Sequence, residues 1–372
     1  MATFSINKMK RRSLLGLFAT ATFAPAAFIA AAMAQPKSGR VLVLLELRGG
    51  NDGLNTVVPY RDPIYRQARP SLALEQPLPL SDGLGLHPSM TAIEPLWREG
   101  RLSFALGLGW PMPNRSHFKA MDQWATGKAS AEGPGWLSAA MDHRHMAGPL
   151  VALAPAGSSS IEGGKAMALQ VAAEALKKQN SAQLNPQLAA ANPVLRRMLE
   201  LELAGARELE RLREGLQPSI SGLAIPKTAL GQQVDIALRL IDSPQCPHVI
   251  TLAQGGYDTH ANQATAHANQ LKQLAEALHV FDRGLKQLTK SPQVTLLAVS
   301  EFGRRLRENG SNGTDHGSAS IGLIYGDFVG RNLPHPFIGK YPSLEHLDQR
   351  GDLIANLTPD LLYQQVLNSL WV

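Results

Sequence analysis

Short apolar runs constrain the fold of this chain more than any other feature of its sequence. Residues 41–47 read VLVLLEL, and residues 294–299 read VTLLAV. Neither run alternates between apolar and polar residues, so each is typical of a strand that is buried on both faces of a parallel sheet. Further apolar runs at 102–108, 249–252 and 321–325 predict three more strands.

Helical patterns stand between these strands. Apolar residues at helical spacing predict helices after Ser89, after Ser116, and at 193–215, 264–288 and 361–370. Residues 59–88 are rich in proline and turn-forming residues, and we expect mostly loop there. Strands that alternate with helices over the whole length predict an α/β sandwich built on a parallel sheet.

Residues 166–216 differ from the rest in composition. Ala, Leu, Gln, Lys and Glu dominate this block at helical spacing. We expect a helical insertion over the sheet at about 166–216, inside one α/β domain that spans residues 35–372.

The first 34 residues predict an export signal. A basic start is followed by the mostly apolar run 14–32, and Ala32-Met33-Ala34 fits cleavage by signal peptidase. The paired Arg11-Arg12 indicates the twin-arginine route, so we expect a periplasmic or secreted protein that meets the membrane only transiently during export. The alternative is an uncleaved membrane anchor, because the run is nearly long enough to span a bilayer.

The charge of the chain does not indicate a nucleic-acid partner. The net charge is +6, but four basic residues and no acidic residue precede Ala34, which leaves +2 on the remainder. A nearly balanced chain without a basic stripe lacks the electrostatic footprint of a DNA- or RNA-binding protein. Cys246 is the only cysteine, so no internal disulfide can form.

Four polar clusters lie beside the predicted strands. They are Arg-Gly-Gly-Asn-Asp-Gly at 48–53, Gly-Gly-Tyr-Asp-Thr-His at 255–260, Ser-Glu-Phe-Gly-Arg at 300–304 and Gly-Thr-Asp-His-Gly at 313–317. Open α/β folds bind their ligands at the carboxyl edge of the sheet, so these clusters predict one shared site there.

Metal ligands are the first interpretation of these clusters. Asp315 and His316 place a hard oxygen beside an imidazole, and Asp258 and His260 stand two apart, where an extended loop points both to one side. The alternative for each pair is a turn or capping aspartate beside an exposed histidine.

Two further carboxylates are candidate ligands. Glu301 follows a buried strand and needs a partner, which is either a metal or the neighbouring Arg304 and Arg305. Asp52 is either a ligand or the first residue of an Asp-Gly turn.

Ser116 is the candidate nucleophile. It precedes a predicted helix, whose amino terminus attracts anions and stabilises an oxyanion on the serine, although such a serine is also a common helix cap. His117 is a base, a metal ligand or a packing residue. The chain has no Gly-x-Ser-x-Gly elbow, dinucleotide fingerprint or phosphate-binding loop.

Together with Arg-Ser-His-Phe at 115–118, the four clusters resemble the exported bacterial family called domain of unknown function 1501, from about residue 41 to the end. That family is similar to the alkaline phosphatase and sulfatase superfamily. The resemblance implies a three-layer α/β/α sandwich with a mostly parallel sheet and a metal site at the strand ends.

The resemblance also implies roles for individual residues. Asp52, Asp258, His260, Glu301 and His316 match metal ligands, and Ser116 matches the helix-start nucleophile. Two features depart from the superfamily's usual pattern. Phe302 stands where a histidine follows the late-strand carboxylate, and the spacing from Asp258 to His260 is shorter.

We therefore predict an exported, metal-dependent hydrolase of phosphate or sulfate esters. Its metal ligands are Asp52, Asp258, His260, Glu301, Asp315 and His316, and the divalent metal is zinc, manganese or calcium. Ser116 attacks the ester, and His117 or a metal handles the proton. A second cation or Arg115, with Asn51 and Arg304, binds the anionic oxygens of a small ester or glycan-like substrate. The alternative is a non-catalytic periplasmic protein that keeps the fold and binds a partner or glycan.

Overall fold

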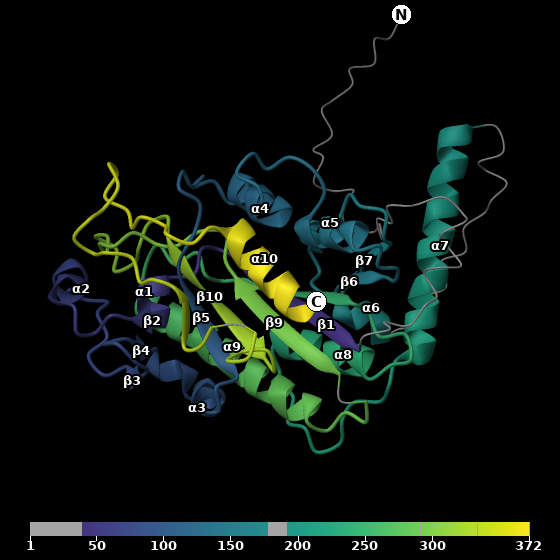
Figure 1. The fold of residues 1–372 in the computed structure, drawn as a ribbon, viewed down its shortest axis with the longest axis horizontal. Coiled ribbons are helices and arrows are strands. Elements are labelled where there is room, and N and C mark those ends of the chain that lie inside the picture. The colour runs from purple at the N-terminus through teal and green to yellow at the C-terminus, as the bar shows by residue number, and fades with distance from the viewer. Residues whose placement is uncertain (1–38, 178–191, 291, 333, 372) are drawn as a thin grey trace, which may run out of the picture.

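The computed structural model describes residues 39–177, 192–290, 292–332 and 334–371. Its centre is an eight-stranded sheet in the order β11-β5-β10-β9-β1-β8-β6-β7 (Figure 1). These strands are β1 (Arg40–Leu47), β5 (Leu102–Leu108), β6 (Leu150–Ala152), β7 (Ala168–Gln170), β8 (Val249–Gln254), β9 (Gln293–Val299), β10 (Ser320–Gly326) and β11 (Phe337–Gly339). The predicted strands are all present, and three short strands extend the sheet.

One strand of the described sheet runs against the others. β10 pairs antiparallel with both β5 and β9, whereas every other strand pairing in this sheet is parallel. The start of β10 therefore lies at the same edge as the ends of β1, β8 and β9. The prediction of a mostly parallel sheet is confirmed.

Helices cover both faces of the sheet, because its central strands are apolar on both sides. In β1, Val41, Val43 and Leu45 pack into one core, and Leu42 and Leu44 pack into another. Each fully buried side chain of this kind stabilises the fold by roughly 1.5–3 kcal/mol.

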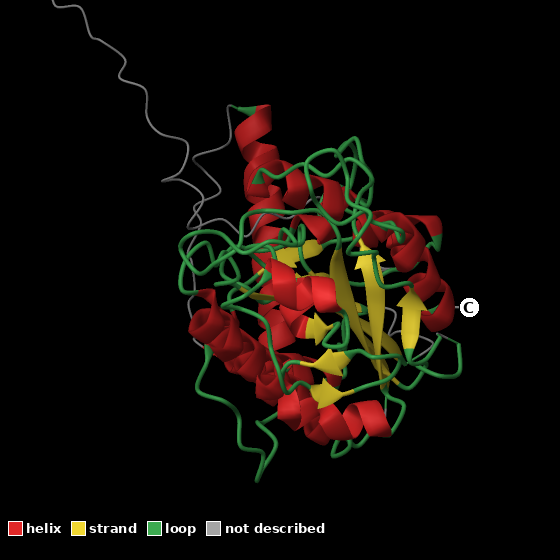
Figure 2. Cartoon of the chain, turned by 90° about the vertical axis from the view of Figure 1, so that its left-hand side faces the viewer, coloured by secondary structure: helices red, strands yellow, loops and turns green. Residues whose placement is uncertain are grey.

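The first core contains the 3-10 helix η3 (Pro88–Ile93) and the helices α3 (Glu94–Arg98), α8 (Ala229–Ile241) and α9 (Gln263–Leu285). The second contains α4 (His117–Thr126), α5 (Trp136–His143) and α10 (Pro359–Leu370). Figure 2 shows red helices on either side of the yellow strands. The predicted three-layer sandwich is confirmed.

Residues 59–88 are mostly loop and turn, as expected, but they also contain α2 (Pro63–Ala68), β3 (Leu78–Pro79) and β4 (Gly85–Leu86). β4 pairs with β3 and with β2 (Val57–Val58), which follows α1 (Gly53–Thr56), in a small sheet. One local expectation differs from the structure. The helix expected after Ser89 is divided into η3 and α3. Pro95 lies in the first turn of α3, where its missing N–H is not needed.

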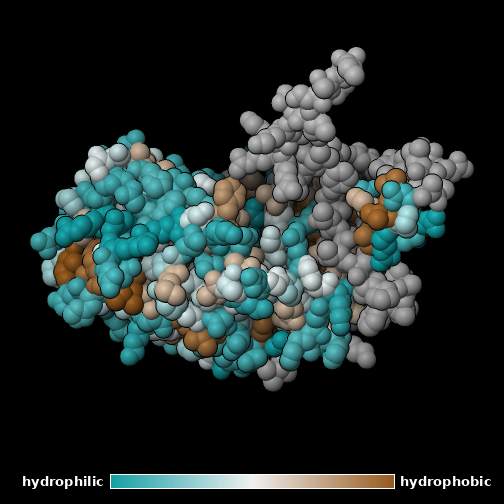
Figure 3. All heavy atoms as spheres, turned by 90° about the horizontal axis from the view of Figure 1, so that it is seen from above, coloured by the Kyte–Doolittle hydropathy of each residue, from teal (hydrophilic) through white to brown (hydrophobic). Residues whose placement is uncertain are grey.

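The block at 166–216 begins with strand β7 and continues with α6 (Ala173–Lys177) and α7 (Pro193–Gly215). Three apolar side chains in the first turns of α7, Val194, Leu195 and Met198, are exposed, and hydrophobic surface is visible at the right of Figure 3. The helical insertion stays a prediction.

Residues 178–191 of that block and the expected export signal at 1–34 lie outside the described residues. No helix within the described ranges combines the length and hydropathy that a membrane span requires.

A buried ion pair anchors the loop after β1. The guanidinium of Arg69 contacts both carboxylate oxygens of Asp52, at 2.5 and 3.0 Å, and both side chains are almost fully buried. Arg69 also donates to the carbonyl oxygens of Arg305 and Leu306, each at 2.9 Å. Burial raises the pKa of Asp52, but Arg69, together with His267 and Gln263, outweighs burial and holds that pKa below its ordinary value.

Replacement of Arg69 by Met leaves the Asp52 carboxylate buried without its cation. We expect Arg69→Met to lower the free energy of unfolding by about 3–5 kcal/mol in denaturant titrations. Arg66→Met, at an exposed position of α2, the helix that ends just before Arg69, changes it by about 0.5 kcal/mol or less.

The pH dependence follows from the depressed pKa of Asp52. The stabilisation is complete above the carboxyl group's ordinary pKa of 3.8 and is lost as the pH falls through the lower folded value. A difference between parent and Arg69→Met that grows below pH 4 contradicts this account.

Candidate metal centre

The four polar clusters converge at one edge of the sheet. Loops 48–53, 255–260 and 300–304 follow β1, β8 and β9, whereas 313–317 precedes β10 and reaches the same edge because β10 is reversed. The shared site predicted from the sequence therefore has a structural basis.

The side chain of Arg304 holds these loops together. It is almost fully buried and donates to the carbonyl oxygens of Gly50 (2.8 Å), Thr314 (2.8 Å), Tyr257 (2.9 Å) and Gly49. It also donates to Asp258 Oδ1 at 2.7 Å. Arg304 thus bonds to the other three loops and orients the Asp258 carboxylate, so it is not free to bind substrate oxygens.

Three imidazoles surround the Asp258 carboxylate. The Nε2 atoms of His260 and His316 lie 2.9 Å apart, and each lies 3.0 Å from Asp258 Oδ1. Nε2 of His117 lies 3.4 Å from Asp258 Oδ2. Within the described ranges, His117, Asp258 and His316 offer ligand atoms that all lie within 4.8 Å of one another.

The Nδ1 atom of each imidazole faces an acceptor. Nδ1 of His316 lies 2.9 Å from the Arg115 carbonyl oxygen, which can only accept. Nδ1 of His260 lies 3.2 Å from Asp315 Oδ1, and Nδ1 of His117 lies 2.9 Å from Glu301 Oε1. A neutral imidazole that donates from Nδ1 presents the lone pair of Nε2, so all three lone pairs are directed at Asp258.

This donor set fits a divalent cation. Donors bound at about 2.1 Å to one cation lie about 2.9–3.4 Å apart, depending on the coordination angle, and the observed contacts fall in this range. Histidines that donate their second ring nitrogen to a carboxylate or carbonyl are typical of metal sites. Several nitrogens with one carboxylate favour zinc over calcium, which prefers oxygen ligands.

The charge of the centre resides on Asp258. Burial raises its pKa, but the hydrogen bond from Arg304, together with the nearby His316 and His260, outweighs burial and lowers the pKa to about 2. The carboxylate is therefore ionised at neutral pH. The hydrogen bond to Glu301 raises the pKa of His117 above its ordinary value.

Ser116 lies beside this centre, at the amino terminus of α4. Its neighbours both contact the cluster, Arg115 through its carbonyl oxygen and His117 through its ring. The residue is exposed and is the N-cap of the helix, but its hydroxyl makes no capping hydrogen bond. The hydroxyl is therefore not engaged at the helix end.

Glu301 and Asp315 bind imidazoles and not the centre itself. Glu301 is buried, and its Oε1 also accepts from the backbone N–H of Gly49 at 2.7 Å. Asp315 is exposed and accepts from Asn309 at 3.1 Å as well as facing His260. Both carboxylates orient histidines.

Three other predicted residues have partners away from the cluster. Asp52 is paired with Arg69, Asn51 is fully buried between Thr56 and His267, and Arg115 is paired with the buried Asp352. The geometry therefore does not bring Asp52 into the metal set, and it leaves Asn51 no access to a substrate.

Sequence reasoning missed two structural residues of the site. Arg69 lies in a segment whose composition indicates loop, so no pattern marks it as the partner of Asp52. The ring of Phe302 packs against His316 and His117, with ring centroids 4.5 and 5.0 Å apart. Phe302 stands where a histidine was expected, and this difference could have suggested that the side chain packs against the site.

The fold and this cluster define an α/β protein with a candidate divalent-cation centre at one edge of its sheet. The chain belongs to the family described as protein of unknown function (DUF1501), whose sequence profile matches residues 40–330. The family expected from the five motifs is confirmed.

The chain is also similar to the C-terminal periplasmic domain of EcEptC from Escherichia coli, solved in complex with zinc. The two share 9% sequence identity and a TM-score of 0.40, and the match covers 91% of this chain and 83% of that one. No curated protein sequence matches the chain.

The cluster predicts zinc binding that depends on His316. We expect the parent protein, freed of metal and titrated with zinc by calorimetry, to bind one equivalent, and His316→Ala to weaken binding by at least about 10-fold. His143→Ala removes an exposed histidine of α5 and leaves binding unchanged. A zinc affinity that is equal in His316→Ala and the parent excludes the cluster as the site.

The contact between Asp315 and His260 predicts a smaller effect. Asp315→Asn keeps the size of the side chain but removes the charge that fixes the His260 ring. We expect zinc affinity to fall about 10-fold, less than with Asp258→Asn, in the same titration. An Asp315→Asn effect larger than that of Asp258→Asn contradicts the assignment of Asp315 as an orienting residue.

Proposed function

We propose that the protein is an exported, metal-dependent hydrolase of phosphate or sulfate esters in which Ser116 is the nucleophile. The observation that carries this proposal is the convergence of three imidazole Nε2 atoms on the Asp258 carboxylate. Beside them lies a serine at a helix amino terminus whose hydroxyl makes no capping hydrogen bond. Attack on an anionic ester requires a nucleophilic hydroxyl group and positive charge near the ester oxygens. The serine supplies the hydroxyl group, and the cation site and the helix dipole supply the positive charge.

His260, His316 and Asp258 would hold the cation, because their contacts of 2.9 and 3.0 Å are the shortest in the cluster. A cation in this position supplies positive charge to the ester's oxygens and lowers the pKa of a neighbouring hydroxyl group. The amino terminus of α4 adds partial positive charge at Ser116.

We assign His117 as the proton acceptor for Ser116. Its contact with Asp258 is the longest in the cluster, at 3.4 Å, and its Nδ1 is held by Glu301 at 2.9 Å. A carboxylate that holds Nδ1 orients the ring and stabilises its protonated form, and it leaves Nε2 to take the proton.

The reaction then has two balanced steps. Ser116 Oγ forms a bond to phosphorus or sulfur as the bond to the alcohol oxygen breaks, and the alcohol leaves with a proton. Water hydrolyses the resulting serine ester, which releases phosphate or sulfate and restores the hydroxyl group.

The same proposal includes the cellular location of the activity. The paired Arg11-Arg12 and the apolar run at 14–32 support export by the twin-arginine route. The substrate is accordingly a small anionic ester or a glycan-like ester in the periplasm or outside the cell.

Removal of the Ser116 hydroxyl tests the mechanism. We expect zinc-loaded Ser116→Ala to hydrolyse 4-nitrophenyl phosphate or 4-nitrophenyl sulfate about 1,000-fold more slowly than the parent, or slower. Its zinc affinity is unchanged, because Ser116 is not one of the ligands.

Ser130→Ala, in the loop after α4, serves as the matched control and keeps the parent rate. Equal turnover by Ser116→Ala and the parent removes Ser116 from the mechanism. A parent that hydrolyses neither ester with zinc, manganese or calcium favours a non-catalytic periplasmic binding protein.

A further inference from the structure

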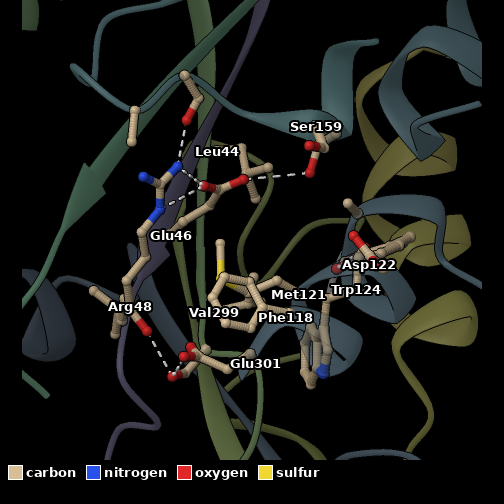
Figure 4. Close-up of a pocket in the computed structure, with 17 residues that line it drawn as sticks. Leu44, Glu46, Arg48, Phe118, Met121, Asp122, Trp124, Ser159, Val299 and Glu301 are labelled. Atoms are coloured by element: carbon tan, nitrogen blue, oxygen red, sulfur yellow. Dashed lines mark hydrogen bonds and ion pairs between the residues drawn. The ribbon is translucent and has the colours of Figure 1, made fainter. Parts of the chain in front are cut away.

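A cavity of about 490 Å³ lies beside the candidate metal centre. It lies between α4 and the carboxyl ends of β1 and β9, and Figure 4 shows the side chains that line it. Cavities of 300–1,000 Å³ are the usual size for small-molecule sites. The proposed chemistry uses none of this space.

Glu301 joins the cavity to the centre. Its side chain lines the cavity, and the same carboxylate lies 2.9 Å from Nδ1 of His117, whose Nε2 faces Asp258. Phe118, the residue after His117, also lines the cavity. A molecule in the cavity is thus separated from the centre by a single imidazole.

One face of α4 supplies a wall that is apolar except for Asp122. Phe118, Met121, Asp122 and Ala125 line the cavity and stand at the one-turn spacing of a helix face. Trp124 from the same helix also lines it, beside Tyr363, and the two rings are edge-on with centroids 6.5 Å apart. Three aromatic side chains therefore border the cavity.

The sheet supplies the opposite wall. Leu44 and Val299 are buried apolar residues of neighbouring strands. At one end Glu46 is paired with Arg48 at 2.6 Å (Figure 4). Glu46 also accepts from Ser158 at 2.6 Å, so its charge is satisfied. The lining therefore offers apolar and aromatic surface, with the paired Glu46 and Arg48 at one end and the carboxylates of Asp122 and Glu301 elsewhere.

We propose that this cavity binds the alcohol part of the ester and that this part is an aromatic group. The inference rests on the proposed function for the place of the reacting bond, which lies at Ser116. Aromatic rings favour offset or edge-on contact with other rings, and the three bordering aromatic residues offer such contacts. The substrate class is thus an aryl phosphate or aryl sulfate.

Binding of a neutral aryl alcohol tests the cavity without any turnover. 4-Methylphenol is titrated into the zinc-loaded parent protein and followed by ligand-observed NMR, with 1-hexanol as the straight-chain comparison. We expect 4-methylphenol to bind and to compete with 4-nitrophenyl phosphate, and 1-hexanol to bind at least several-fold more weakly.

Phe118→Ala removes one aromatic wall and weakens 4-methylphenol binding by about 10-fold, because both the ring–ring contact and the buried apolar surface are lost. Phe118 is 69% exposed, so the substitution does not open the core. Ala156→Phe fills the cavity from its rim and has the same effect. Met112→Ala, an 88% exposed residue outside the lining, is the matched control and leaves binding unchanged.

The outcomes separate this inference from the proposed function. Loss of 4-methylphenol binding in Phe118→Ala and Ala156→Phe supports the aromatic subsite even where no ester is hydrolysed. Absent binding of 4-methylphenol, equal binding in Phe118→Ala, or equal binding of 1-hexanol overturns it even where esters are hydrolysed.

Discussion

The buried guanidinium of Arg304 is the interaction on which the candidate centre depends. It bonds to the loops after β1 and β8 and to the loop before β10, and its own loop follows β9. A guanidinium presents its donors in a rigid planar fork, so the relative positions of these loops are set by one side chain. Gly49 and Gly50 have positive φ angles and let the backbone approach Arg304 closely. Asp258 receives its orientation from the same group that compensates its charge.

Much of the fold could be predicted because it follows from local patterns. The runs at 41–47 and 294–299 are short and apolar on both sides, and such a pattern is typical of a strand covered on both faces. The direction of β10 could not be read in this way. An apolar run looks the same whether the strand runs with its neighbours or against them, and its reversal is fixed by pairing with β5 and β9.

The candidate site was harder to predict, because a polar residue's role depends on what surrounds it. Asp258, His260 and His316 come together, since their loops end at the same edge. Asp52 and Asn51 lie in a motif that suggests a ligand site equally well. Both side chains are buried, however, and they bond to Arg69 and His267 inside the protein. Neither partner is close to the motif in sequence. The sequence does not distinguish base, ligand and packing roles for His117, and the structure supplies its contacts with Glu301 and Asp258.

The spread of the cluster along the chain has a consequence for its assembly. Its side chains come from α4, from the loop after β8 and from the loop before β10, so the cluster spans nearly two hundred residues of sequence. His316, one of the three proposed ligands, comes last of these side chains in the chain. Capture of a metal ion at this position therefore requires a chain that has been synthesised through His316 and folded, and an occupied centre reports completed folding.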